Sequence, residues 1–470
     1  MRDAPIDALS LDPLREALGR ERHDRFAEAM ERAKRALGDR VVWHVNSTSR
    51  GGGVAELLRP LVGAARGFGM DWRWVTIEGG EDFFTVTKRI HNHLHGSAGD
   101  GGPLGVDERR VYDATLAAEA PDLVGRLGPS DLVFLHDPQT AGLAPFLRAD
   151  VGTLIWRCHI GVDEPNELAI AARRFLRPAV DRVDARVFST PRHVWDHVGS
   201  GPAVVIAPSI DPTTPKNQAI PEDVVHAILG ASGISSERTV ARPAFRRIDG
   251  RGDVVTRRAK LIPDEPLPPD LPLVVQVSRW DRLKDPLGVL RGFADHVASS
   301  SDAHLVLAGP SLDGIADDPV EGEVLAEVVD ARRASPPSAQ RRIHLALLPM
   351  QDQQENGVIV NALQRRAEVV VQKSLAEGFG LTVAEAMWKE KPVLASAVGG
   401  IVDQIDDGAT GSLLEDPSDL ETFGKLVRSL LEDDDVRAQM GRRGREAVRE
   451  RFLLSRELVQ HAELLDSFHS

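Results

Sequence analysis

The sequence predicts an α/β protein with two doubly wound, Rossmann-like domains that face an interdomain cleft. Three observations support this prediction. The chain has 470 residues, which is too long for one ordinary hydrophobic core and suits two domains of roughly 200 residues each. Short apolar segments alternate with helical segments, as in parallel sheets with right-handed crossovers. A stretch rich in proline and charge divides these segments into two sets.

The first set of strands belongs to a domain predicted over residues 41–215. Before it, residues 8–37 have apolar side chains at mostly helical spacing, which predicts an N-terminal helical extension within 1–40. Most of the following strands are continuously apolar, as strands buried on both faces should be. They are predicted at 41–47, 72–77, 131–137, 153–160, 185–190 and 203–209.

A linker or insert is predicted over residues 216–270, because residues 211–271 are rich in proline and charge, with DPTTPKNQAIPEDVV at one end and IPDEPLPPDLP at the other. The second domain is predicted over 271–450, and a last helix lies within 451–470. Strand carboxyl ends face the ligand crevice in open α/β sheets, so functional residues are expected there. The strands of the second set are predicted at 272–280, 304–310, 343–349, 368–374 and 391–397.

Composition narrows the possible functions. The formal net charge of −14 argues against a general nucleic-acid binder but allows a local basic pocket for a phosphorylated ligand. The single cysteine excludes an intramolecular disulfide and a cysteine-cluster metal site. No apolar run reaches the ~18 residues of a membrane span, and the first residues lack the apolar core of a secretory signal. A cytoplasmic enzyme without a membrane partner is therefore expected.

Three consecutive glycines, Gly51, Gly52 and Gly53, follow the first strand and precede a helix. Glycines let the backbone approach a ligand closely, and a helix N-terminus offers free N–H groups to an anion. The spacing fits neither the Walker A motif nor the dinucleotide fingerprint. A phosphate-binding loop and a simple tight turn both remain open on this evidence.

Two cations, Arg279 and Lys284, lie just after a buried-looking strand in QVSRWDRLKDP. Both would suit a diphosphate, because they stay charged and can stabilise a departing phosphate. A solvated loop with internal ion pairs to Asp281 and Asp285 is the structural alternative, and it is favoured for this spacing alone.

Two glutamates, Glu377 and Glu385, lie in SLAEGFGLTVAEAMWKEKP around a strand-to-helix turn. Thr382 and Glu385 fit the S/T-x-x-E capping box, so a helix cap worth roughly 1 kcal/mol could explain Glu385. Glu377 has no such structural explanation. Its carboxylate would suit the hydroxyl groups of a sugar, which donate hydrogen bonds to carboxylates.

Histidines occur both in one short tract and at predicted strand ends. The tract HNHLH at 91–95 resembles a metal site, but its spacing does not place all three rings on one helical face, so no metal site is predicted. His136, Asp137 and His159 fall at strand ends, where an active-site role is more credible. Cys158 reads as a small buried hydrophobic residue.

These motifs together resemble retaining glycosyltransferases of the GT-B fold. The E-x7-E pattern of Glu377 and Glu385, preceded by VSRWDRLKDP, matches that family in order and spacing. The blocks WHVNSTSRGGGVAELLRPLV, FFTVTKRIHNHLHG, FLHDPQTAGL, WRCHIGVDEPN and APSIDPTTPKN resemble, more specifically, trehalose synthases of the glycosyltransferring type. The likeness covers about residues 40–455. It implies transfer of glucose from a nucleoside diphosphate glucose to free glucose, giving α,α-trehalose, in a reaction that could also run backwards.

The resemblance implies roles for the donor side. Arg279 and Lys284 would hold the diphosphate and stabilise it as it leaves, and Glu377 would bind the donor glucose; these three are the implied catalytic residues. Glu385 would bind the ribose hydroxyls. The cradle would be completed by backbone N–H groups of Phe379, Gly380 and Leu381, and by the loop of Gly51, Gly52 and Gly53.

On the acceptor side, the resemblance implies that Asp137 contacts the acceptor and His159 the transferred glucose. It implies no tightly bound cofactor or metal; the donor would be ADP-, UDP- or GDP-glucose, and nothing in the sequence requires Mg²⁺. It also favours a homodimer and a last helix that crosses back to the first domain.

Alternative functions stay open at this stage. A retaining glycosidase would need two carboxylates about 5 Å apart and would have no use for two cations beside them. A transferase of the same fold could use another acceptor, such as a sugar phosphate or glycerate. A non-catalytic module that binds nucleotide sugar is a third alternative, although the presence of both cations and both glutamates argues against it.

Overall fold

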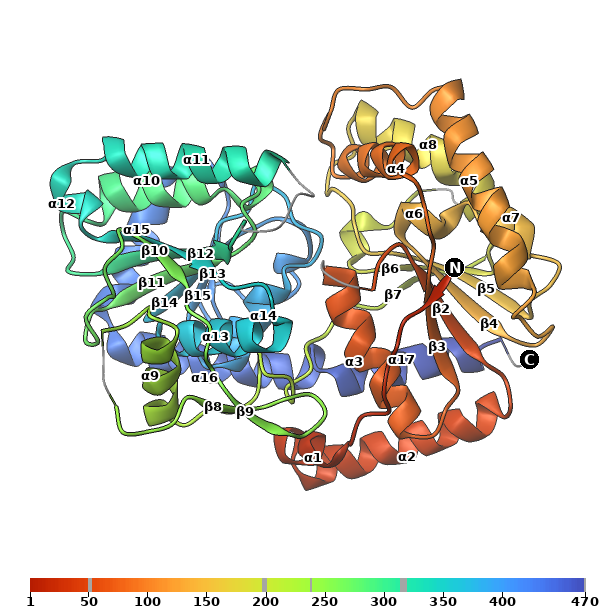
Figure 1. The fold of residues 1–470 in the computed structure, drawn as a ribbon, viewed down its shortest axis with the longest axis horizontal. Coiled ribbons are helices and arrows are strands. Elements are labelled where there is room, and N and C mark those ends of the chain that lie inside the picture. Colours follow the sequence, from red (N-terminus) through yellow and green to blue (C-terminus); the bar gives the residue numbers. More distant parts are fainter. Residues whose placement is uncertain (50–52, 197–200, 237–238, 313–318, 469–470) are drawn as a thin grey trace. The chain divides into compact units, whose positions relative to one another are not determined.

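The protein is described here by a computed structural model, which covers residues 1–470 except 50–52, 197–200, 237–238, 313–318 and 469–470 (Figure 1). The chain divides into two compact units. The first comprises Met1–Ser209 together with Leu454–Ser470, and the second comprises Ile210–Leu453. Each unit contains one seven-stranded sheet.

The sheet of the first unit has the order β1-β3-β2-β4-β5-β6-β7. All pairs are parallel except that of β1 with β3. The six strands predicted for this part of the chain are all present, and every residue of β2, β4 and β5 is buried, as continuous apolar runs indicate. The strands are β1 Arg2–Asp3, β2 Val42–Asn46, β3 Trp72–Thr76, β4 Leu132–His136, β5 Thr153–Cys158, β6 Ala185–Phe188 and β7 Ala203–Val205.

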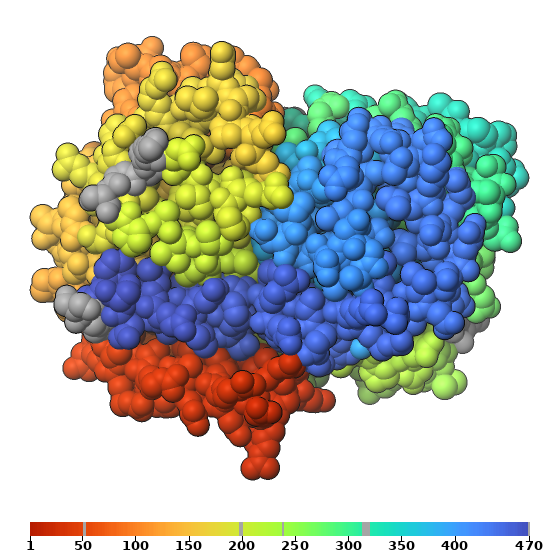
Figure 2. Space-filling view, turned by 180° about the vertical axis from the view of Figure 1, so that it is seen from behind, coloured from red at the N-terminus to blue at the C-terminus, as the bar shows by residue number. Residues whose placement is uncertain are grey.

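Helices cover both faces of this sheet. In Figure 1, α2, α3 and α17 lie on one side of it, while α4, α5, α6 and α8 lie on the other. The C-terminal helix α17 packs against α2, and Figure 2 shows it as a dark blue band beside the red N-terminal helices. The helices are α1 Asp12–Leu18, α2 Arg20–Leu37, α3 Gly53–Gly67, α4 Glu81–Leu94, α5 Val106–Val124, α6 Asp137–Ala141, α7 Ala144–Leu147, α8 Glu167–Val180, η1 Pro191–His193 and α17 Leu454–Asp466.

The sheet of the second unit has the order β10-β13-β12-β11-β14-β15-β16, parallel except for the edge strand β10. The five strands predicted for this part are present, and β8 with β9 forms a separate two-stranded sheet. The strands are β8 Ala244–Arg246, β9 Gly252–Val254, β10 Lys260–Ile262, β11 Leu273–Val277, β12 His304–Pro310, β13 Ile343–Leu348, β14 Val369–Gln372, β15 Val393–Ser396 and β16 Ser412–Leu414.

The helices of the second unit also form two layers. Contacts group α10 with α11, α12 and α15, and they pair α13 with α9 and α14 with α16. No helix in the described part of the chain is long and apolar enough to cross a membrane. The helices are α9 Glu222–Ala231, η2 Arg282–Lys284, α10 Pro286–His296, α11 Pro319–Ala334, α12 Pro337–Gln340, α13 Gln353–Arg366, α14 Leu381–Trp388, η3 Gly399–Ile401, α15 Leu420–Glu432 and α16 Asp434–Arg451.

The segment expected to be a linker, 216–270, is built into the second unit. It contains α9, the β8–β9 hairpin and β10, which pairs antiparallel with β13. The buried carboxylate of Glu355 in α13 accepts hydrogen bonds from the backbone N–H groups of Thr256 and Arg257, at 2.5 and 2.6 Å. The segment is therefore not a flexible linker. Although it is rich in proline and charged residues, it forms a helix and short strands, and it is hydrogen-bonded to α13.

Each parallel sheet has a point where the strand order reverses. In the first sheet it lies between β2 and β4, and in the second between β11 and β14. In open α/β sheets, helices that follow the two strands at such a point leave on opposite sides, and ligands bind outside the strand carboxyl ends there. The predicted functional residues follow these strands: Asp137 follows β4, Lys284 follows β11 and Glu377 follows β14.

Candidate active site

The connection after β11 is held in one conformation by its own side chains. The indole of Trp280 is buried and donates to the carbonyl of Pro310 at 2.9 Å. Asp281 accepts a hydrogen bond from the N–H of Leu283 at 2.9 Å, and the amide of Gln276 donates to the carbonyl of Lys284 at 2.9 Å. These bonds place Lys284 at the end of a fixed 3-10 turn at the switch point of the second sheet.

Lys284 and Glu377 are brought together from opposite sides of this switch point. The ammonium of Lys284 lies 2.5 Å from Oε2 of Glu377, and the hydroxyl of Ser374 donates to the same oxygen at 3.3 Å. The two side chains keep 19% and 11% of their surface exposed, so both ends of the pair are still reachable. A cation and a carboxylate side by side fit a ligand in which a phosphate adjoins sugar hydroxyls.

Arg279 lies differently. Its guanidinium pairs with Asp281 at 3.0 Å and approaches Glu321 at 3.6 Å, and 57% of its side chain is exposed. The internal ion pair considered from the sequence is therefore present for Arg279. Within the described residues, no contact joins it to Lys284 or to Glu377.

A second ion pair lies beneath this region. Lys373, whose side chain is 1% exposed, pairs with Asp285, and Asp285 in turn accepts a hydrogen bond from the N–H of Gly288 at 2.9 Å. Asp285 has a positive φ of 46° and precedes Pro286 at the start of α10. The pair joins the end of β14 to the end of the β11 connection, and the sequence pattern did not predict it.

The helix α14 begins two residues earlier than the capping box requires, so that prediction is wrong. Its N-cap is Gly380, with φ 83° and ψ 58°, and no side chain caps the helix. The hydroxyl of Thr382 donates to Oε1 of Gln372 at 2.8 Å. The left-handed backbone that glycine permits sets the helix start, and Thr382 already lies inside the first turn.

Glu385 is buried and carries one ion pair. Its Oε1 lies 3.0 Å from the ammonium of Lys216, and its side chain is 4% exposed. Its other oxygen, Oε2, is buried and has no hydrogen-bond partner among the described residues. A buried carboxylate oxygen without a partner is costly, which points to a ligand that donates to it.

Phe379, Gly380 and Leu381 lie between Glu377 and Glu385. Phe379 is buried, and its carbonyl accepts a hydrogen bond from the buried amide of Gln404, at 2.5 Å. Gly400 donates its N–H to the carbonyl of Gly378 at 3.1 Å. The turn is therefore fixed from both ends, and the uncapped start of α14 has free N–H groups to offer.

In the first unit, the structure brings Asp137 and His159 together. The backbone N–H of His159 donates to Oδ1 of Asp137 at 2.7 Å. Asp137 begins α6 with φ 58°, and its carbonyl accepts from the indole of Trp156 at 3.1 Å. A positive φ outside glycine is strained and is kept here by tertiary contacts, as is common where a side chain is aimed for function.

Burial controls the charge of this pair. It raises the pKa of Asp137 to about 7, against the weaker opposing effects of the hydrogen bond from His159 and of Arg157. It lowers the pKa of His159 well below its usual range, with the positive charge of Arg157 acting in the same direction. The pair therefore combines a carboxyl group that titrates near neutral pH with a neutral imidazole.

The glycine-rich loop is only partly described. Gly51 and Gly52 lie outside the described residues, so the prediction for them has no structural description. Gly53 is exposed and is the first residue of α3, after β2 at the switch point of the first sheet. A Cβ added to Gly53 would meet nothing within 4 Å.

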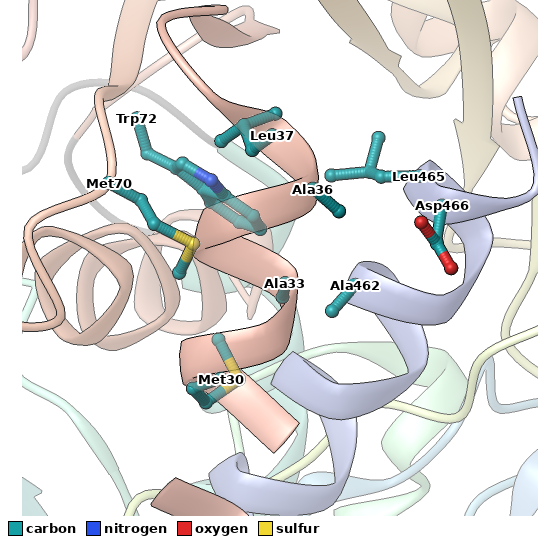
Figure 3. A pocket seen from close by; sticks show the side chains of 9 residues that line it. All are labelled: Met30, Ala33, Ala36, Leu37, Met70, Trp72, Ala462, Leu465 and Asp466. Carbon is teal, nitrogen blue, oxygen red and sulfur yellow. The ribbon is translucent and has the colours of Figure 1, made fainter. Parts of the chain in front are cut away.

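A pocket elsewhere in the first unit has a different character (Figure 3). It lies where α2 and α17 meet the start of β3, and it includes none of the predicted site residues. Its lining offers a single carboxylate, so it lacks the chemistry of a transfer site. The lining residues are Met30, Ala33, Ala36, Leu37, Met70, Trp72, Ala462, Leu465 and Asp466.

Comparisons with known proteins agree with this arrangement. The family model for the N-terminal domain of trehalose synthase matches residues 44–195, and the model for group 1 glycosyl transferases matches residues 257–447. A trehalose synthase of Thermococcus litoralis is 33% identical over 97% of both chains. One from Rubrobacter xylanophilus is 35% identical over 93% of this chain and 92% of its own.

The chain belongs to the trehalose synthase family. It is a glycosyltransferase, and the predictions of family and of a trehalose-forming enzyme are confirmed at this level. These relatives match over nearly their whole length, so the alternatives that use another acceptor are not favoured.

Solved structures show the fold. One similar structure is a trehalose-phosphate synthase from Burkholderia xenovorans in complex with glucose-6-phosphate. It superposes with a TM-score of 0.66 at 16% sequence identity, and the match covers 92% of this chain and 100% of the other. A sucrose-phosphate synthase from Thermosynechococcus elongatus gives 0.58 at 16%, covering 91% and 98%. The predicted GT-B class of two doubly wound domains is confirmed.

No group of three or more metal-binding side chains occurs among the residues that the structure describes. The residues that sequence reasoning missed are partners: Lys216 for Glu385, and Lys373 for Asp285. Lys373 had a detectable signal, because a lysine directly after a buried strand must find a partner or reach solvent. Lys216 had none, since it lies far from Glu385 in the sequence.

Proposed function

We propose that this member of the trehalose synthase family transfers glucose from a nucleoside diphosphate glucose to free glucose, with retention, to give α,α-trehalose. The observation that carries the proposal is the Lys284–Glu377 pair at the switch point of the second sheet. The ammonium group of Lys284 suits the diphosphate of the donor, and the carboxylate of Glu377 suits the glucose hydroxyls of the same donor.

The leaving group would be stabilised by charge. Breaking the bond between glucose C1 and the phosphate oxygen builds negative charge on the phosphate, which Lys284, Arg279 and the uncapped start of α14 would meet. Arg279 would exchange its exposed pairing with Asp281 for the donor. Exposed ion pairs contribute little, so this exchange costs little free energy.

The nucleotide would be held by Glu385. Its unpartnered Oε2 would accept hydrogen bonds from ribose hydroxyls, while Lys216 pairs with the other oxygen. ADP-, UDP- and GDP-glucose all carry the same ribose diphosphate, so each is a candidate donor.

The acceptor would be bound by the first unit. Asp137 would accept a hydrogen bond from a hydroxyl of the acceptor glucose, and His159 would contact the transferred glucose. With retention, the acceptor oxygen bonds to C1 on the face that the phosphate leaves, and its proton passes to the departing phosphate. A homodimer and a cytoplasmic location stay predictions from the sequence.

The test is an assay of the purified protein with ADP-, UDP- or GDP-glucose and free glucose. We expect α,α-trehalose, identified by NMR, together with free nucleoside diphosphate. Glucose-6-phosphate and glycerate serve as rival acceptors. Nucleotide release with one of these and not with glucose would overturn the proposed acceptor.

Variants at the two cations test the donor site. We expect Lys284→Ala and Arg279→Ala to abolish measurable transfer, because each removes a charge that stabilises the leaving diphosphate. Circular dichroism should show an unchanged fold. Arg282→Ala is a matched control, since Arg282 is exposed on the same turn and pairs with Glu327 at 2.7 Å. Activity of either test variant within tenfold of wild type would refute the assignment.

A further inference from the structure

Three histidines form a line across neighbouring strands of the first sheet. His44 lies in β2, His136 ends β4, and His159 directly follows β5. Nδ1 of His44 lies 3.0 Å from Nε2 of His136, and Nδ1 of His136 lies 3.0 Å from Nε2 of His159. Adjacent rings are stacked, with interplanar angles of 28° and 15°.

The three imidazoles are neutral. His44 and His136 are completely buried, and burial lowers the pKa of His44 to about 3 and that of His136 well below its usual range. A neutral imidazole has one N–H, so it donates at one nitrogen and accepts at the other. The two hydrogen bonds in the line must therefore run in the same direction, either towards His159 or away from it.

The inner end of the line decides the direction. Nε2 of His44 is buried and has no hydrogen-bond partner among the described residues. If the bonds ran inward, this nitrogen would carry an orphaned N–H, which is rare in protein interiors. Protons on Nδ1 of His44 and Nδ1 of His136 avoid this orphaned N–H.

We propose that His44 and His136 are positioning residues that fix His159 as its Nδ1–H tautomer, so that this ring presents a hydrogen-bond donor to a sugar hydroxyl oxygen. The proposal rests on the role of His159 given under the proposed function. Because Nε2 of His159 accepts from His136, its proton must lie on Nδ1, and no described residue bonds to that nitrogen.

The tautomer makes the pair with Asp137 complementary to a sugar. A hydroxyl group both donates and accepts a hydrogen bond. Asp137 offers a carboxylate oxygen that accepts, and the fixed tautomer of His159 offers an N–H that donates. With the other tautomer, two acceptors would face the sugar, and one hydroxyl lone pair would lose its partner at a cost in binding.

The test is long-range ¹H–¹⁵N NMR on the full-length, ¹⁵N-histidine-labelled protein, with His159→Gln used to assign the signal. We expect the Nδ1–H pattern for His159 in the wild type. His136→Asn keeps an amide that can donate to Nε2 of His159 and should retain the pattern. His136→Phe keeps ring size but has no donor, so its His159 signal should shift towards the Nε2–H form, with kcat/KM reduced more than tenfold.

An Nε2–H pattern in the wild type would overturn the proposal, as would an unchanged Nδ1–H pattern in His136→Phe. Once His159→Gln has assigned the signal, the wild-type spectrum decides the direction without His136→Phe. It also needs no turnover. If the wild type made no trehalose but showed the Nδ1–H form, the proposed function would fail while the tautomer assignment stood.

Discussion

At the scale of single residues, the two glutamates of the E-x7-E pattern have different surroundings. Oε2 of Glu377 contacts both Lys284 and Ser374. Oε2 of Glu385 is buried and has no hydrogen-bond partner among the described residues. The pattern alone suggested a helix cap for Glu385. In the structure, Oε2 of Glu385 is instead an unpartnered acceptor to which a ligand can donate a hydrogen bond.

The unpartnered oxygen of Glu385 gives a quantitative prediction. Glu385→Gln should weaken binding of UDP or ADP by roughly tenfold to a hundredfold, because a hydrogen bond to a charged group is worth about 1.5–3 kcal/mol. Isothermal titration calorimetry measures the change. Glu390→Gln is the matched control, since Glu390 is exposed and pairs with Arg445 at 2.7 Å. Equal affinities in the two variants would contradict the ribose assignment.

The raised pKa of Asp137 predicts how stability depends on pH. With a pKa of about 7 in the folded protein and 3.8 as the ordinary value, the folded state binds more protons between these values. Stability from this group is therefore complete below pH ~4 and is lost as pH rises to about 7. The free energy of unfolding falls by at most about 4 kcal/mol, because a difference of one pKa unit corresponds to about 1.36 kcal/mol.

Asp137→Asn isolates this effect, because asparagine tolerates a positive φ and can still accept from the N–H of His159. The stability of the variant relative to wild type should rise between pH 4 and pH 8, as measured by urea unfolding. A difference that does not change with pH would show that Asp137 is not a buried carboxyl group with a raised pKa.

At the scale of elements, the start of α14 depends on one glycine. Gly380 has φ 83°, and a Cβ there would lie 2.9 Å from Cγ1 of Ile401. Gly380→Ala should therefore cost about 1–3 kcal/mol from the backbone alone, with a further cost from the contact, and should displace the N–H groups proposed to bind phosphate. Chemical denaturation and donor KM measure both effects.

The control for Gly380 separates the two causes. Gly408 has φ 72°, but a Cβ there would meet nothing within 4 Å. Gly408→Ala should show only the backbone cost and an unchanged donor KM. If Gly380→Ala were no more harmful than Gly408→Ala, the close contact with Ile401 would not constrain this turn.

The elements also show what could be predicted from the sequence. Every predicted strand was found, because runs buried on both faces are visible without knowing their neighbours. The strands β1, β8, β9, β10 and β16 were missed, because each has only two or three residues, too few to form a recognisable apolar run. The same difference applies to the candidate site. Residues at strand ends, such as Lys284 and Asp137, could be predicted from the sequence, whereas a partner such as Lys216 approaches its carboxylate only through tertiary packing.

At the scale of the whole molecule, the last helix completes a unit that begins with the first residue. Glu457 in α17 pairs with Arg157 in β5 at 3.0 Å, and its other oxygen accepts from the hydroxyl of Ser209 at 2.6 Å. Both members of the ion pair are 1% exposed or less. The resemblance implied a helix that returns to the first domain, and this network fastens α17 to the sheet of the first unit.

Removing Glu457 should therefore unfold the first unit selectively. Glu457→Ala leaves the guanidinium of Arg157 buried without its partner, and loss of one member of a buried pair costs about 3–5 kcal/mol. Hydrogen exchange should show faster exchange in β5 and α17 and unchanged protection in β11 and β14, because the described ion pair lies within the first unit. Glu463→Ala, an exposed change on the same helix, should leave both units unchanged. Equal loss of protection in both sheets would mean that the two units unfold as one, and that α17 is not specific to the first.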